Sequence, residues 1–153
     1  MDNEVHLRIL MLEDTMLRKI LVAIDGSAHA RAALDFAIDL AARYGATLVL
    51  LHAFPHVSDL LGTPQYEHLL VARTLNGERL LESAQTQVGD AAPVDTQLVE
   101  GPAAPAILQI AAEEGCDMIV VGSRGHGQLA GLLLGSVSSA VAQRAECPVL
   151  IVH

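Results

Sequence analysis

Four short and almost uninterrupted apolar segments constrain the fold of this chain more than any other feature. They are Ile20–Ile24 (ILVAI), Thr47–Leu51 (TLVLL), Met118–Val121 (MIVV) and Val149–Val152 (VLIV). A strand that is apolar on both sides must be buried on both sides, as in a parallel sheet that helices cover. A fifth segment, Val94–Glu100 (VDTQLVE), alternates apolar and polar residues, which predicts an edge strand with one face in water.

The stretches between these strands have helical spacing. Ser27–Tyr44 opens with a residue that can cap a helix, repeats apolar residues every three or four positions, and is followed by Gly45. Asn76-Gly77 interrupts the second helical pattern. With right-handed crossovers, this order predicts an α/β domain with a five-stranded parallel sheet, strand order 3-2-1-4-5, and helices on both faces. The three later helices are expected over Tyr66–Val88, Ala103–Glu114 and Ser136–Ala145.

Two segments fall outside this repeat. Residues 1–17 are expected to be an N-terminal extension to a domain of residues 18–153, and Val5, Leu7, Ile9 and Met11 alternate as in a strand that could pair with an edge. Residues 55–65 are expected to form a loop, which is a candidate lid by position.

Composition excludes several classes of protein. The chain has 153 residues, which suits one domain, and although it is 52% hydrophobic, no apolar run approaches the roughly 20 residues of a membrane-spanning helix. The first residues do not resemble a signal peptide, so we expect a cytoplasmic protein. A net charge of −9, scattered basic residues and 3% aromatic residues argue against nucleic-acid binding. Cys116 and Cys147 have no metal-binding or redox spacing and are expected to be small buried or half-buried residues.

The segment that indicates chemistry is Val121–Ser139, which runs from the end of a buried strand to the start of a helix. Its glycines at Gly122, Gly125 and Gly127 are expected to permit a tight turn and close approach of a ligand. Gly135-Ser136 then opens a helix whose free amides and dipole favour an anion, most often a phosphate. The alternative is that the glycines merely shape a crowded loop and that Ser136 caps the helix. The predicted strand order brings this loop beside Asp25, at the point where strand order reverses and doubly wound sheets bind ligands.

These residues resemble the universal stress protein family, from about Arg18 to Val152. The resemblance is carried by LVAIDGS (Leu21–Ser27), by LLHAF after the second strand, and by GSRG…LLLGSVSSAVAQRAECPVLIV. ATP-binding members have the motif G-x2-G-x9-G-[S/T], which is present here without a change in spacing. The resemblance implies a Rossmann-like fold of the adenine nucleotide alpha hydrolase kind. It also implies an ATP-binding regulatory or stress-response protein, with ADP or AMP as other possible ligands.

The resemblance also implies which residues form the site. Ala53 would meet adenine through its backbone, and Asp25 would reach the ribose or a Mg²⁺ ion bound to phosphate. The alternative for Asp25 is a turn or cap residue, and His126 could equally be a solvated loop residue. The implied binding residues are Ala23, Ile24, Asp25, Ala53, Val121, Gly122, Arg124, Gly125, His126, Gly135, Ser136, Val137 and Ser138. Substitution of Gly125 or Gly135 by Val is expected to abolish binding because a Cβ would occupy the ligand's approach.

Other functions fit less well. The chain lacks the first-turn glycines of dehydrogenases, the Gly-Lys-Ser/Thr of P-loop NTPases and the G-x-S-x-G of hydrolases. No catalytic residues are assigned, so we expect at most slow ATP hydrolysis. The alternative function is a stress protein that binds no nucleotide and acts through protein contacts. The apolar last strand, Val149–Val152, predicts a homodimer through this sheet edge, because an exposed apolar edge promotes aggregation.

Overall fold

The structure is a computed structural model, and it describes residues 17–58, 62–126 and 134–153. The alternating residues of the N-terminal extension, Val5 to Met11, lie outside the described residues, as does Gly127. Residues 59–61 of the expected loop also lie outside them.

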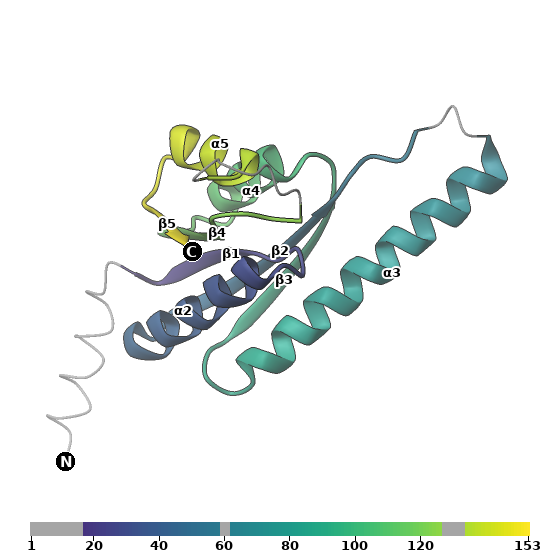
Figure 1. Cartoon of the computed structure of the whole chain (residues 1–153). Helices are drawn as coiled ribbons and strands as arrows, with labels where there is room; N and C mark the ends of the chain where they lie inside the picture. The colour runs from purple at the N-terminus through teal and green to yellow at the C-terminus, as the bar shows by residue number, and fades with distance from the viewer. Residues whose placement is uncertain (1–16, 59–61, 127–133) are drawn as a thin grey trace, which may run out of the picture.

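A parallel sheet of five strands forms the centre of the domain (Figure 1). Its order is β3-β2-β1-β4-β5, so the predicted order is confirmed, with the alternating segment at one edge and the apolar last strand at the other. Ile20 on β1 pairs with Leu48 of β2 on one side and with Met118 of β4 on the other. The strands are β1 (Lys19–Ala23), β2 (Thr47–Phe54), β3 (Val94–Glu100), β4 (Met118–Gly122) and β5 (Val149–Val152).

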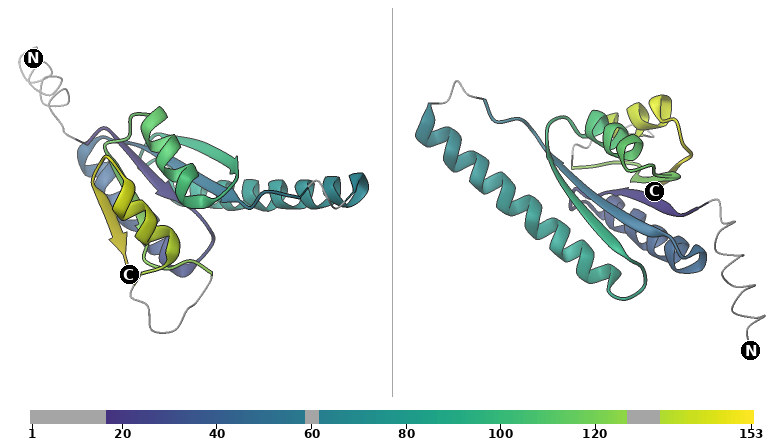
Figure 2. Two further views of the ribbon diagram at one scale, coloured as in Figure 1. Left: turned by 90° about the horizontal axis from the view of Figure 1, so that it is seen from above. Right: turned by 180° about the vertical axis from the view of Figure 1, so that it is seen from behind.

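Helices cover both faces of this sheet, as predicted. Helices α2 (Ala28–Tyr44) and α3 (Thr63–Val88) pack on one face, and α4 (Ala103–Glu113) and α5 (Ser136–Arg144) pack on the other (Figures 1 and 2). Neighbouring residues of β1 point to opposite cores: Ile20 joins the core under α2 and α3, whereas Leu21 joins the core under α4 and α5. Both are fully buried, which explains why this strand is apolar throughout.

Helix α2 begins and ends as its sequence predicts. The Ser27 hydroxyl accepts a hydrogen bond of 3.1 Å from the amide of Ala30, which satisfies one of the free donors at the helix start. Gly45 ends the helix in the left-handed region at φ 69°. The start of α2 is therefore fixed directly after β1.

Two boundaries differ from the sequence prediction by three residues, and the others agree with it to within one residue. Strand β2 continues to Phe54 because Ala53 and Phe54 still pair with Val99 and Glu100 of the edge strand. Helix α3 begins at Thr63 rather than Tyr66, since a proline in the first helical turn needs no amide partner and fits the helical φ. The connecting loop is therefore shorter than residues 55–65.

Helix α3 is the longest helix, and its N-terminal part projects beyond the sheet (Figure 2, left). Val71 and Leu75 on this part are 56% and 46% exposed. Among the described residues, no helix is both long enough and apolar enough to cross a membrane.

The two cysteines lie away from the carboxyl edge of the sheet, near the start of β4 and β5. Cys116 is buried and Cys147 is half-buried, as expected. Burial raises the pKa of the Cys116 thiol to about 11, which keeps it protonated at neutral pH.

Candidate functional site

A cavity of about 240 Å³ opens at the carboxyl ends of β1 and β4, where the strand order reverses. We call it the α5 cavity because the N-terminus of α5 forms one of its walls. Every residue that the sequence predicted for the site lines this cavity: Ala23, Ile24, Asp25, Ala53, Val121, Gly122, Arg124, Gly125, His126, Gly135, Ser136, Val137 and Ser138. The structure thus brings together residues from β1, β2, β4 and α5.

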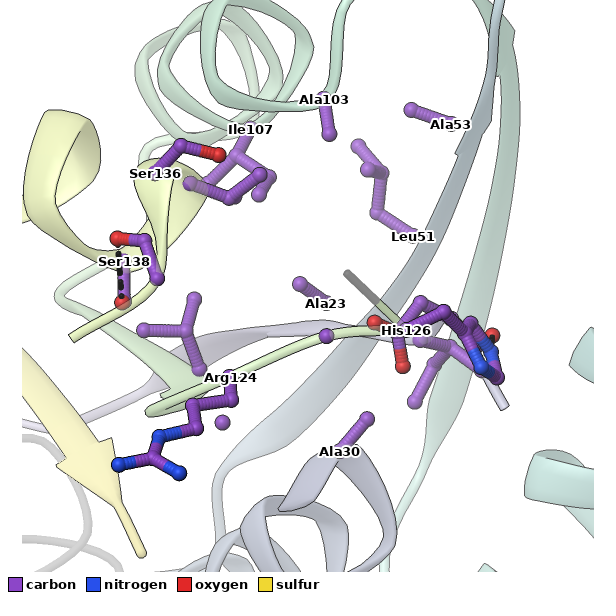
Figure 3. A pocket seen from close by; sticks show the side chains of 17 residues that line it. Ala23, Ala30, Leu51, Ala53, Ala103, Ile107, Arg124, His126, Ser136 and Ser138 are labelled. Carbon is purple, nitrogen blue, oxygen red and sulfur yellow. Dashed lines mark hydrogen bonds between the residues drawn. The ribbon is translucent and has the colours of Figure 1, made fainter. Parts of the chain in front are cut away.

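The α5 cavity has an apolar side and a polar side (Figure 3). Leu51, Ala53 and Ala103 lie together on one side, and Ser136 and Ser138 lie across the cavity from them, at the start of α5. An arrangement of this kind suits a ligand with a flat apolar part and a polar or charged part.

Asp25 follows β1 and bonds locally as a turn residue. Its Oδ1 accepts a hydrogen bond of 2.8 Å from the amide of Ser27, which fits the alternative interpretation of this residue. Its backbone carbonyl lies 2.6 Å from Nε2 of His126, and since a carbonyl can only accept, this nitrogen carries the hydrogen. These two contacts hold the backbone and the side chain of Asp25 in place. Its second carboxylate oxygen, Oδ2, lies toward Gly125.

The three motif glycines allow close packing of protein on protein. A Cβ on Gly122 would lie 2.7 Å from the carbonyl carbon of His29, and one on Gly125 would lie 2.8 Å from Oδ2 of Asp25. On Gly135 it would lie 3.3 Å from the carbonyl oxygen of Ser123. None of the three adopts a positive φ. Gly122 and Gly125, for which a tight turn was predicted together with Gly127, therefore do not need the left-handed conformation that favours glycine. At Gly122 and Gly135 an added side chain would press first on protein backbone, so its effect on a ligand would come together with a change in packing.

The start of α5 is held against the end of β4. The Gly135 amide donates to the Ser123 carbonyl at 2.7 Å, and the Ser138 hydroxyl lies within 3.0 Å of the same carbonyl and 3.1 Å of that of Gly135. The contact between the Ser138 hydroxyl and the Gly135 carbonyl is the dashed line in Figure 3. Ser138 is 2% exposed, so its hydroxyl positions the helix rather than facing solvent.

Gly135 is the N-cap residue of α5, and no side chain caps this helix. The alternative interpretation, in which Ser136 caps the helix, is therefore wrong. The amides of Ser136, Val137 and Ser138 precede the first intrahelical bond, which Ser139 makes to Gly135. These amides form the positive end of the helix dipole, and the residues that carry them line the α5 cavity.

The two basic residues of the loop differ in position. The guanidinium group of Arg124 extends away from the centre of the cavity, whereas His126 lies at its edge, next to β1 (Figure 3). An anion at the start of α5 would thus depend on backbone amides more than on Arg124. Within the described ranges, no group of three or more His, Cys, Asp or Glu side chains is arranged to hold a metal ion.

The sequence did not identify four further residues of the cavity wall. They are Ala30, Leu51, Ala103 and Ile107. Leu51 is close to the end of β2, and Ala103 begins α4, so the rule that sites form at the carboxyl ends of strands could have found both. Ala30 and Ile107 are helix residues whose position depends on packing, for which the sequence carries no local signal.

Comparison with known proteins matches residues 16–153 to the universal stress protein family. A universal stress protein of Thermus aquaticus is 42% identical over 138 residues, which cover 90% of this chain and 100% of the relative. Among solved structures, universal stress protein UspA from Lactobacillus plantarum is similar at a TM-score of 0.82 and 26% identity, covering 92% of this chain and 100% of its own. A universal stress protein solved in complex with cAMP is similar at a TM-score of 0.66 and 29% identity, covering 91% of this chain and 98% of its own. The chain belongs to the universal stress protein family.

Proposed function

We propose that this protein binds an adenine nucleotide in the α5 cavity and acts as a cytoplasmic, nucleotide-dependent regulatory protein. ATP is the first candidate ligand and ADP and AMP are the others. The observation that carries the proposal is the uncapped start of α5, where Ser136, Val137 and Ser138 line the cavity. A phosphate group satisfies such amides and interacts favourably with the helix dipole.

The rest of the cavity suits a nucleoside. The adenine ring would lie between Ala53 and Ala103, where small side chains leave room for a flat ring, and would bond to the backbone at Ala53. The ribose would then lie near Asp25, whose carboxylate can accept hydrogen bonds from ribose hydroxyls. In a nucleoside triphosphate complex, Asp25 would also be within reach of a phosphate-bound Mg²⁺, which prefers oxygen ligands.

A relative with a nucleotide supports this proposal. The universal stress protein solved in complex with cAMP is 29% identical to this chain and has a similar fold. Its ligand contains an adenine base, a ribose and a phosphate, which are the three groups that the α5 cavity would hold.

We expect at most slow hydrolysis of ATP. The titratable residues that line the cavity are Asp25, Arg124 and His126. The Nε2 proton of His126 is directed to the Asp25 carbonyl, and Oδ1 of Asp25 is bonded to the Ser27 amide. Nδ1 of His126 and Oδ2 of Asp25 can still accept a proton, but among the described residues the cavity wall has no second carboxylate, histidine or lysine to pair with them in general acid–base catalysis.

The test is to extract bound nucleotide from the purified protein with acid and to measure ATP uptake by equilibrium dialysis. We expect an adenine nucleotide in the extract, or saturable binding of one ATP per chain. No nucleotide in the extract and no uptake in dialysis would contradict the proposal and favour action through protein contacts alone.

We also propose that two copies pair through β5. Val149, Leu150 and Ile151 are only half-buried at the sheet edge, which leaves an apolar strand with one unpaired side. Replacing Ile151 by Lys should convert a dimer into a monomer in sedimentation at micromolar concentration. A monomeric wild-type protein at this concentration would contradict the dimer.

A further inference from the structure

A second cavity, of about 490 Å³, lies between α3 and the end of β2. We call it the α3 cavity. Its wall includes Asp25, Ala53 and His126, which also line the α5 cavity, so the two cavities adjoin at the ends of β1 and β2. The α3 cavity has no role in the proposed function.

Hydrogen-bond donors gather in the α3 cavity. Arg73 and Asn76 are three residues apart on α3 and therefore share a face of the helix, and both line the cavity. Arg73 Nη1 donates to the carbonyl of Pro55 at 2.5 Å and lies 3.5 Å from that of His56, which ties the helix to the end of β2. A guanidinium group has five N–H donors, and these contacts use a single nitrogen.

His52 adds a ring nitrogen to the same cavity. Its side chain is 8% exposed, and its Nδ1 lies 2.6 Å from the carbonyl of Ile24. Because a carbonyl only accepts, Nδ1 carries the hydrogen. Nε2 has no protein partner in the described part of the chain, and it can accept from an O–H group or, when protonated, donate to an anion.

The Asn76-Gly77 pair, which interrupted the helical pattern, explains how α3 comes so close to His52. A Cβ on Gly77 would lie 2.5 Å from Cδ1 of Leu98 and 2.8 Å from Cδ2 of His52. A glycine inside a helix lowers its stability, and here it avoids a clash, because a Cβ at this position would have to displace the side chains of Leu98 and His52. Gly77 therefore sets the distance between Asn76 and the histidine.

We propose that the α3 cavity takes a second phosphate group, carried on the ribose of a nucleotide whose base and first phosphate occupy the α5 cavity. This inference rests on the proposed function, which places the ribose at Asp25, in the wall that the two cavities share. Beyond Asp25 lie Arg73 and Asn76, which are donors, and His52, which donates when its Nε2 is protonated, in a chain of net charge −9. A guanidinium group matches the geometry of a phosphate.

The charge of Asp25 does not prevent this arrangement. Its Oδ1 bonds to the Ser27 amide at the start of α2, so that the carboxylate interacts with the positive end of a helix dipole. The ligand class is therefore an adenosine bisphosphate, with a 5′-phosphate and a 2′- or 3′-phosphate.

Isothermal titration calorimetry with AMP, adenosine 3′,5′-bisphosphate and adenosine 2′,5′-bisphosphate tests the inference. We expect one of the bisphosphates to bind the wild-type protein at least about tenfold more tightly than AMP, the change that a charge-assisted hydrogen bond produces. Which isomer is preferred tells which ribose hydroxyl faces the α3 cavity. The Arg73→Gln variant should lose this preference while its affinity for AMP stays the same.

Two further variants make the result specific. Arg79→Gln makes the same change of charge at an exposed position of α3 outside the cavity, and it should keep the preference. His52→Asn retains a donor for the Ile24 carbonyl and removes Nε2, so it should reduce the preference even if Arg73→Gln fails to fold. If AMP binds and neither bisphosphate binds more tightly, or if the preference survives in both Arg73→Gln and His52→Asn, the inference is wrong. If no adenine nucleotide binds at all, it is the proposed function that fails.

Discussion

Substituting alanine at each of the motif glycines, Gly122, Gly125 and Gly135, should show which of them matter for the stability of the fold and which for the affinity for a nucleotide. In Gly122→Ala, the new Cβ would lie 2.7 Å and 2.9 Å from backbone atoms of His29 and Ala30. Ordinary carbon contacts begin at about 3.5 Å, so β4 and α2 must separate by about 0.8 Å. Neither element can yield cheaply, because both are anchored by their own backbone hydrogen bonds.

The expected effect of Gly122→Ala is a large loss of stability. Overpacking costs about 1–3 kcal/mol, and contacts to backbone place this variant in the upper half of that range. For a chain of this length, about 2–3 kcal/mol corresponds to a fall in Tm of roughly 4–12 °C. Thermal unfolding followed by circular dichroism without ligand measures this fall.

Gly125→Ala should behave differently. Within the described part of the chain, its Cβ would meet the side chain of Asp25, with Oδ2 at 2.8 Å, and the carboxylate can rotate at the cost of its bond to Ser27. The loss of stability should be about 0.5–1.5 kcal/mol, whereas nucleotide affinity should fall about 10- to 100-fold because Asp25 is displaced. Gly135→Ala, at 3.3 Å from the Ser123 carbonyl, should lose less than about 1 kcal/mol.

The reasoning would be refuted by a Gly122→Ala protein as stable as wild type. It would also be refuted if Gly125→Ala bound nucleotide normally in calorimetry. The rank order of Tm, with Gly122→Ala lowest, is the result that tests the packing of these glycines.

Two further predictions concern buried groups. Ser138→Ala should lower the free energy of unfolding by about 0.5–1.5 kcal/mol, since the hydroxyl bonds to the Ser123 and Gly135 carbonyls. It should also weaken nucleotide binding, because the start of α5 shifts. Urea unfolding measures the first effect and calorimetry the second, and unchanged values would contradict the prediction. In the folded protein, burial raises the pKa of the Cys116 thiol from its ordinary value of 9.0 to about 11. The contribution of the protonated thiol to stability is therefore complete below pH 9 and is lost as the pH rises to about 11. Urea unfolding should show a smaller loss of stability between pH 9 and 11 in Cys116→Ala than in wild type, and equal losses would contradict this effect of burial.

The sequence predicted the sheet well because the signal for it is local. Strands that are apolar on both faces, such as the one at Ile20, can be stable only inside a parallel sheet, and β3 revealed its edge position by alternation. The ends of elements were less predictable. Phe54 belongs to β2 only because Glu100 pairs with it across the sheet, which no local pattern records.

The residues that the sequence assigned to one site do line one cavity, but what each of them contacts depends on tertiary packing. Gly122 and Gly125 stood out as glycines, and only the structure shows that they make room for α2 and for Asp25. In the same way, Asn76-Gly77 weakened the prediction of α3, although Gly77 is what lets that helix contact His52. A glycine in a sequence can indicate that another group packs close to the backbone, but it does not identify that group.

The most direct test of nucleotide binding in the α5 cavity is a crystal structure of the protein with AMP. The account predicts phosphate oxygens within hydrogen-bonding distance of the Ser136–Ser138 amides, adenine between Ala53 and Ala103, and the ribose at Asp25. A nucleotide bound elsewhere, or a phosphate held by Arg124 without contact to the start of α5, would contradict it.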